Sequence, residues 1–142
     1  MERRDFIRLG ALGATVGLVA PTLAIASSEV SIKSANDIYF TKAEPGRWSA
    51  KVATHLPSIE IEKAAGKVTI KVVTPHEMKG YEHYIVKHVL LDQNYKFIEE
   101  HLFDPTKDTA AISTFTLTDY SGPIYALSLC NKHDLWLHGT LV

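Results

Sequence analysis

The alternation of apolar and polar residues along the chain predicts short β-strands. Residues 58–62 read Ser-Ile-Glu-Ile-Glu, and residues 68–73 repeat the same period of two. This period places one face of each segment in a core and the other in water. Further β-type segments occupy residues 84–91, 95–103, 111–118, 124–129 and 135–137. About seven short strands with turn residues between them predict an all-β protein built as a β-sandwich.

Helical patterns are almost absent from the mature part of the sequence. No segment after residue 28 keeps a helical period over three turns, and only residues 34–37 have the composition of a helix start. Pro57 follows His55 closely, and proline cannot donate a ladder hydrogen bond. We therefore expect His55 at a strand edge or in a loop. No linker or repeat divides residues 27–142, which we expect to form one domain.

The first 26 residues have the features of an export signal. A charged start with Arg3-Arg4 leads into an apolar run rich in alanine and glycine, which ends at the small-residue triplet Ala24-Ile25-Ala26. The pattern Arg3-Arg4-x-Phe6-Ile7-Arg8 resembles a twin-arginine signal, and an ordinary secretory signal is the alternative. We expect a periplasmic protein. No second apolar stretch of spanning length follows, so we expect no membrane span in the mature form.

Composition limits the classes of partner that we expect and the possible states of the cysteine. The formal net charge is -1, and without a basic excess we expect no binding to nucleic acid. Hydrophobic residues make up 46% of the chain, enough for a folded core. Cys130 is the only cysteine, so an internal disulfide is impossible. In an oxidising compartment such a cysteine is expected to be buried, modified or bound to a metal.

Histidines surround this cysteine in the sequence pattern. Cys130-Asn131-Lys132-His133 follows one strand and precedes another, so a thiolate and an imidazole can reach one metal ion. Sulfur and nitrogen together suit iron, copper or zinc better than magnesium or calcium. Alone the pair is a weak signal. His76 and His83 flank a glycine-containing loop, and with His55 they strengthen the prediction of a metal centre.

These motifs, taken in order, resemble the iron domain of the superoxide reductase family, which includes neelaredoxin and the catalytic domain of desulfoferrodoxin. The resemblance spans roughly residues 48–136 and includes the lead-in Pro45-Gly46-Arg47-Trp48. It implies an immunoglobulin-like β-sandwich that holds one mononuclear non-haem iron. The implied ligands are four equatorial histidines and one axial cysteine: His55, His76, His83, His133 and Cys130.

The resemblance also implies a reaction. A ferrous ion at such a site gives one electron to superoxide at the position opposite the sulfur, and hydrogen peroxide is released. An axial thiolate pushes electron density onto iron, as it does in haem enzymes that activate oxygen. The two-iron members of the family carry a second site made of four cysteines, which a chain with one cysteine cannot form. An external electron-donor protein is therefore implied.

The sequence departs from the family pattern just before the first histidine. A Glu-Lys pair is usual there, and this chain has Ala53-Thr54. Lys51 lies four residues before His55, on the same face of an extended strand, and is a candidate substitute for the missing lysine. Lys132 and Lys79 are further candidates. A cation beside the open position would attract superoxide, although surface solvation is the ordinary role of a lysine.

Other departures affect the last two ligand motifs. The spacing from His76 to His83 is one residue longer than usual, and Glu77 stands where proline is common. If His76 is not a ligand, His101 or His138 is the fallback, whereas His88 is expected to be structural. Asp134 replaces a glycine that often follows the last histidine. The carboxylate of Glu77 or Glu82 is a candidate for the place of the missing glutamate.

Two other functions fit part of the pattern. A late Cys-x-x-His in a sandwich also suits a copper electron-transfer site, but such a site usually has an axial methionine after the histidine. The methionines here are Met1 and Met78, both upstream of Cys130. A non-catalytic metal-binding domain of the same fold also fits, given Ala53-Thr54. The sequence leaves the oligomeric state open, including a homo-oligomer.

Overall fold

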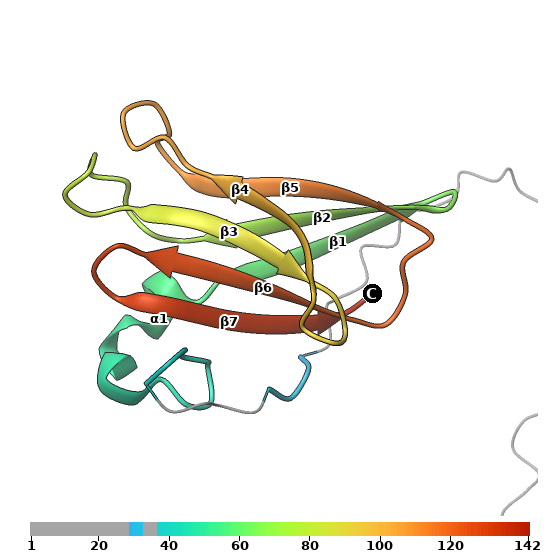
Figure 1. The fold of residues 1–142 in the computed structure, drawn as a ribbon, viewed down its shortest axis with the longest axis horizontal. Helices are drawn as coiled ribbons and strands as arrows, with labels where there is room; N and C mark the ends of the chain where they lie inside the picture. Colours follow the sequence, from blue (N-terminus) through green and yellow to red (C-terminus); the bar gives the residue numbers. More distant parts are fainter. Residues whose placement is uncertain (1–28, 33–36) are drawn as a thin grey trace, which may run out of the picture.

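The computed structural model describes residues 29–32 and 37–142. Within them the chain forms two stacked antiparallel sheets (Figure 1). The three-stranded sheet has the order β1-β2-β5, and the four-stranded sheet has the order β4-β3-β6-β7. The strands are β1 Ser58–Ala64, β2 Lys67–Thr74, β3 Ile85–Leu91, β4 Phe97–Leu102, β5 Ala111–Thr118, β6 Pro123–Cys130 and β7 Asp134–Leu141. The predicted all-β sandwich is confirmed.

Alternating residues from both sheets form the core between them. In β2 buried and more accessible residues alternate. Val68, Ile70 and Val72 are buried, and the residues between them are more accessible. They pack against Leu90 and Ile124 of the opposite sheet. This arrangement is the direct consequence of the period of two in the sequence, and it fixes the register at which strands end.

The segment before β1 is helical, contrary to our expectation of a strand edge or loop at His55. A 3-10 helix, η1 Gly46–Lys51, continues into α1 Val52–His55. The helix ends at His55 because Leu56 precedes a proline and takes an extended backbone, with ψ of 122°. Lys51 and His55 still share a face, since residues four apart are neighbours on a helix. The segment is too short to produce a periodic sequence signal.

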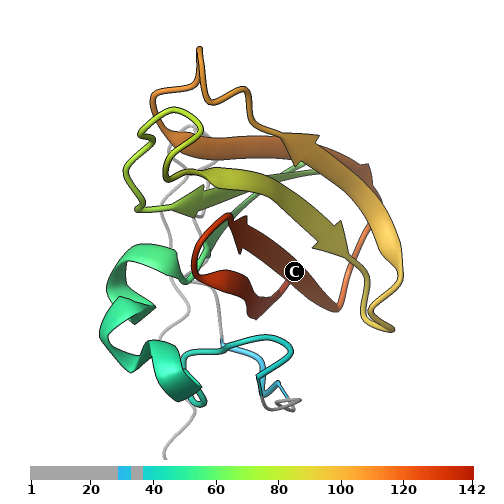
Figure 2. The same ribbon diagram turned by 60° about the vertical axis from the view of Figure 1, so that its left-hand side comes forward.

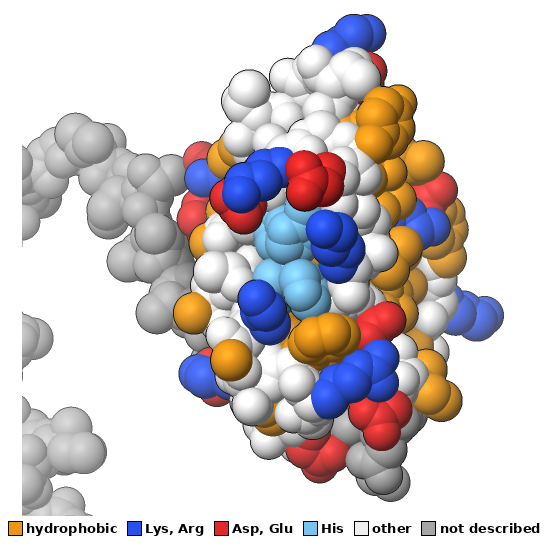
Figure 3. Space-filling model, turned by 90° about the vertical axis from the view of Figure 1, so that its left-hand side faces the viewer, with side chains coloured by type: hydrophobic (Ala, Val, Ile, Leu, Met, Phe, Trp, Pro, Cys, Tyr) orange, Lys and Arg blue, Asp and Glu red, His pale blue; other side chains and the backbone are white. Residues whose placement is uncertain are grey.

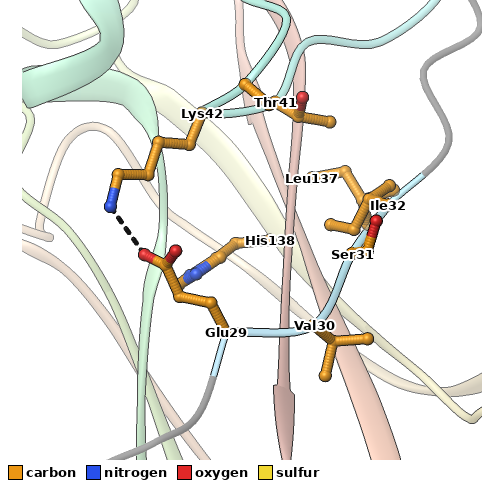
Figure 4. Close-up of a pocket in the computed structure, with 9 residues that line it drawn as sticks. Glu29, Val30, Ser31, Ile32, Thr41, Lys42, Leu137 and His138 are labelled. Atoms are coloured by element: carbon orange, nitrogen blue, oxygen red, sulfur yellow. Dashed lines mark hydrogen bonds and ion pairs between the residues drawn. The ribbon is translucent and has the colours of Figure 1, made fainter.

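The described residues before the helical segment border the free edge of β7. Phe40 bridges Trp136, and Glu29 bridges Thr140. A surface cavity of about 560 Å³ lies between this segment and β7; Glu29 and Lys42 on its wall form an ion pair of 2.6 Å (Figure 4).

The expected helix start at 34–37 falls mostly outside the described residues, as does the expected signal at 1–26. No helix in the described ranges is long and apolar enough to cross a membrane.

A buried polar network joins the two sheets. The His88 ring on β3 lies 2.8 Å from the Thr74 hydroxyl through Nε2 and 2.8 Å from the Ser113 hydroxyl through Nδ1. The Thr74 hydroxyl also lies 2.7 Å from that of Ser128. All four side chains are buried, so the expected structural role of His88 is that of a satisfied core residue. Burial, and then His101, lower the pKa of His88 to about 3.

This buried histidine makes the fold sensitive to acid. In the unfolded chain the imidazole regains an ordinary pKa near 6.5 and binds a proton that the folded state excludes. Stability is therefore unaffected by His88 above that pH and falls as the pH drops toward 3. We expect this residue to reduce the free energy of unfolding by about 2 kcal/mol between pH 7.5 and pH 5.

Urea unfolding of metal-free protein at the two pH values measures this term. His88→Gln is expected to lower stability at pH 7.5, because it disturbs the network, but to flatten the change between the two pH values. His101→Gln, which alters an exposed histidine on the adjacent strand, is the matched control and should alter the change only slightly, because burial is the larger cause of the lowered pKa of His88. An identical pH dependence in His88→Gln and the unmodified protein would refute this account.

Candidate metal centre

Three parts of the chain meet at one end of the sandwich. α1 ends at His55, the loop between β2 and β3 carries His76 and His83, and β6 ends at Cys130 just before the connection that carries His133. The helical lead-in and the two connections lie together in both ribbon views (Figures 1 and 2). One nitrogen or sulfur atom from each of these five residues lies within 4.8 Å of all the others. The structure thus brings together every residue that the sequence singled out as a ligand.

Nitrogens of the four imidazoles lie within 4.8 Å of one another, and three successive short distances link them into an open ring. Nε2 of His55 lies 3.0 Å from Nδ1 of His133, which lies 3.1 Å from Nε2 of His83, which in turn lies 3.0 Å from Nε2 of His76. Two nitrogens bound at right angles to one metal, each at about 2.1 Å, would be about 3.0 Å apart. These spacings therefore match four corners around a single ion.

The cysteine sulfur lies off this ring of nitrogens, toward the protein interior. Sγ of Cys130 is 3.7 Å from Nε2 of His76 and 3.6 Å from Nδ1 of His133, two nitrogens at non-adjacent corners. Cys130 is buried, while His83 and His133 are partly exposed. The sulfur thus approaches from the buried side, and His83 and His133 lie toward the exposed side.

Hydrogen bonds outside the ring fix the tautomers of two histidines. Nδ1–H of His55 donates to the carbonyl oxygen of Lys51 at 3.2 Å and lies 2.8 Å from the Thr54 hydroxyl. Nδ1–H of His76 donates to the carbonyl oxygen of Glu77. A ring with its proton on Nδ1 presents the lone pair of Nε2, which is the form that ligates metals. Both lone pairs point into the centre.

The environment keeps the four imidazoles uncharged at neutral pH. Burial lowers the pKa of His55 to about 4, with further lowering by His76 and His133. Burial is also the main cause of the lowered pKa of His76, His83 and His133. Metal ions compete with protons for these nitrogens, so at pH 7 the protons offer little competition.

Cys130 stays a thiol at neutral pH while no cation is bound. Its side chain packs with Ile85, Phe103, Ala111 and Met78, and this burial raises the pKa of the thiol. Backbone N–H groups of Lys132 and His133 act in the opposite direction, because they stabilise the thiolate. The two N–H groups are thus positioned to support a sulfur anion once a metal supplies the main charge.

Lysines stand around the exposed histidines. A space-filling view of this end shows histidine side chains at the surface with lysine or arginine side chains on several sides (Figure 3). After burial and His83, Lys51 and Lys132 contribute to the lowered pKa of His133, so their positive charges act on the ring. Lys79 instead forms an ion pair of 3.3 Å with Glu77.

No carboxylate completes the cluster among the described residues. Neither Glu77 nor Glu82 belongs to it, so neither takes the place of the missing glutamate in this structure. His101 and His138 also lie outside it. His101 is exposed on β4, and Nδ1–H of His138 donates to the carbonyl oxygen of Pro57 at 2.7 Å. The fallback assignments are therefore not needed to reach four histidines.

Sequence reasoning missed a group of contacts beside His133. The indole of Trp48 lies edge-on to the His133 ring, with 4.7 Å between centroids and 87° between planes. Its Nε1–H donates to the carboxylate of Asp134 at 2.8 Å, and Arg47 also pairs with that carboxylate. The glycine-to-aspartate departure at position 134 was visible in the sequence, but its partners, 86 and 87 residues away, were not.

The donor set fits a transition metal. Four neutral imidazoles and one thiol at these distances match the preferences of iron, copper or zinc, whereas magnesium prefers oxygen ligands, which the described residues do not bring into the cluster. The sulfur lies on the buried side of the cluster, so the exposed side would leave room for a further group to reach a bound metal. The fold and this cluster together define a β-sandwich with a histidine–cysteine centre.

Comparison with known proteins agrees with that class. The family model described as desulfoferrodoxin matches residues 47–139. This match covers most of the described chain, and the chain belongs to the desulfoferrodoxin family. No curated protein sequence matches it significantly.

Solved structures of superoxide reductases resemble this chain. Neelaredoxin from Ignicoccus hospitalis is 26% identical, with 78% of this chain and 98% of that chain covered and a TM-score of 0.62. A superoxide reductase in the oxidized state is 29% identical, with 75% and 98% covered and a TM-score of 0.58. A putative superoxide reductase from Thermotoga maritima, 22% identical, shares the fold with a TM-score of 0.60. The sequence-based resemblance to the family is confirmed.

The protonation states of the cluster predict how many protons a metal displaces. At pH 7 the lowered pKa values leave the histidines neutral, and the raised pKa leaves Cys130 protonated. Binding of a divalent ion should therefore release about one proton per chain, that of the thiol. Calorimetry of zinc binding in buffers of different ionisation enthalpy measures this number. Cys130→Ala should reduce it to near zero; release of two or more protons would contradict these protonation states.

Proposed function

We propose that this protein is a superoxide reductase with one mononuclear non-haem iron. In this proposal His55, His76, His83 and His133 would supply four nitrogens to the iron, and Cys130 would supply a sulfur. The observation that carries it is the convergence of five such donors within 4.8 Å in a member of the desulfoferrodoxin family. Structural relatives named as superoxide reductases support the same activity.

Iron held by these residues would supply the one electron that reduces superoxide, and two protons would complete hydrogen peroxide. The chain supports this chemistry in several ways. Neutral imidazoles leave the centre with a net positive charge when a divalent ion and one thiolate are combined, which favours an approaching anion. The partial exposure of His83 and His133 admits water, which we take as the proton source.

Two lysines would steer the substrate. The charges of Lys51 and Lys132 act on the outward histidines, and positive charge at the mouth of a site raises the encounter rate with an anion. Lys51 is the stronger candidate because it also acts on His76. Its position one helical turn before His55 follows from α1 and η1.

The setting of the reaction is part of the proposal. We propose export through the twin-arginine signal of residues 1–26, which allows a protein to fold and take up its metal before export, and function in the periplasm. One cysteine leaves no second cluster of the four-cysteine type, so an external donor protein would return the electron. A homo-oligomer is compatible with this scheme.

Loss of the sulfur ligand tests the central assignment. Cys130→Ser should retain the fold, since serine has the same shape as cysteine with a slightly smaller oxygen in place of sulfur. It should bleach the thiolate-to-iron visible absorption of the oxidised protein. Superoxide reduction, followed by pulse radiolysis or stopped flow, should fall below detection. Retained colour together with retained activity would remove Cys130 from the site.

Lys51→Ala tests electrostatic steering. Removal of one positive charge should slow the second-order reaction with superoxide roughly two- to fivefold at low ionic strength and flatten its salt dependence. Lys63→Ala removes a more exposed lysine from the far end of β1, away from the cluster, and is the control for loss of one positive charge. If Lys51→Ala and Lys63→Ala react alike, Lys51 does not steer the substrate.

A further inference from the structure

The β6–β7 connection contains an aspartate in a conformation that favours glycine. Cys130 and Asp134 are paired across the hairpin, with a three-residue loop between them. Asp134 has a φ of 62°, in the left-handed region where hairpins of this length usually place glycine. Aspartate enters this region more readily than most residues, yet it still costs free energy relative to glycine. Something other than the turn itself therefore accounts for the carboxylate.

That carboxylate connects the hairpin to the helical lead-in. It accepts the indole N–H of Trp48 at 2.8 Å and pairs with Arg47. The guanidinium of Arg47 in turn lies 5.3 Å from the ring centre of Trp48 and 5.3 Å from that of Phe40. Both partners come from η1, whose backbone departs from helical angles at Trp48, with φ of -102° and ψ of 25°. The indole is thus held in a defined orientation.

The oriented indole contacts His133 directly. Its T-shaped contact with the imidazole, 4.7 Å between centroids, restricts rotation of that ring. His133 also presents Nδ1 to the cluster, whereas His55, His76 and His83 present Nε2. Nδ1 lies closer to the backbone than Nε2, so its position follows every small change in the hairpin and in the ring torsion.

The geometry points to Asp134 as a positioning residue for His133, acting through Trp48. Its carboxylate ties the indole against the imidazole and ties the lead-in that carries Lys51 to the hairpin that carries Cys130. Groups that lie outside the ligands and hold them in place orient the ligand and tune the metal. This inference rests on the metal site proposed above, and it assigns a role to a side chain by which this sequence departs from the family pattern.

Asp134→Gly removes the carboxylate and keeps the backbone, because glycine readily adopts a φ of 62°. Cobalt(II) added to the mature, metal-free chain reports the site through its visible ligand-field bands and its thiolate-to-cobalt band. We expect Asp134→Gly to shift these bands and to weaken Co²⁺ binding about tenfold. Asp134→Asn keeps an oxygen that accepts the indole N–H. It should keep the bands at the positions of the unmodified chain and the Co²⁺ affinity within about twofold of it. Trp48→Phe, which keeps a ring but lacks the donor, should resemble Asp134→Gly.

Asp37→Gly is the matched control. Asp37 also has a positive φ, 58°, and also pairs with Arg47, at 3.4 Å, but within the described ranges it forms no hydrogen bond or ion pair with Trp48 or His133. Its bands and Co²⁺ affinity should equal those of the unmodified chain. Unchanged bands and affinity in Asp134→Gly would overturn the positioning role while leaving the metal site intact. An unmodified chain that binds no Co²⁺ would instead overturn the proposed site, and the inference with it.

Discussion

The convergence of four imidazole nitrogens and one sulfur is the constraint on which this structure depends. Uncharged nitrogens held about 3.0 Å apart, with two lone pairs fixed inward by outer hydrogen bonds, gain little from one another. Only a cation at their centre turns this arrangement into a favourable one. The fold must therefore hold the donors in place by other means, and the free energy for doing so comes from the sandwich. In a preorganised site of this kind, packing of the core and not contact among the donors holds the donor atoms in place.

The support for the site is layered. Val72 and its neighbours bury the two sheets against each other, which fixes where β2 and β6 end and so where His76 and Cys130 begin their approach. The Thr74–His88–Ser128 contacts join the same strands two residues before each of these donors. On the outer side, Trp48 and Asp134 hold the lead-in against the hairpin. A ligand from each of three separate segments can meet at one point only because these contacts act together.

The sequence predicts most of this, for identifiable reasons. Strand segments are recognisable because a two-sided sheet imposes a period of two, and the donors are recognisable because they lie at loops or strand ends in an order that resembles the family motifs. The helical turn that ends at His55 was not predictable, since four residues carry no periodicity and a following proline suits a loop equally well. The partners of Asp134 were hidden because they depend on a contact across 86 residues of sequence. Long-range geometry of this kind arises only when the whole sandwich is formed.

The metal content of the mature protein, purified without oxygen, tests the central claim most directly. Elemental analysis against protein concentration should give about one iron per chain, because one set of five donors is available. Copper in its place would indicate an electron carrier. No metal, even after reconstitution with ferrous iron, would contradict the iron site and leave a β-sandwich of the desulfoferrodoxin family that shares the fold without the chemistry.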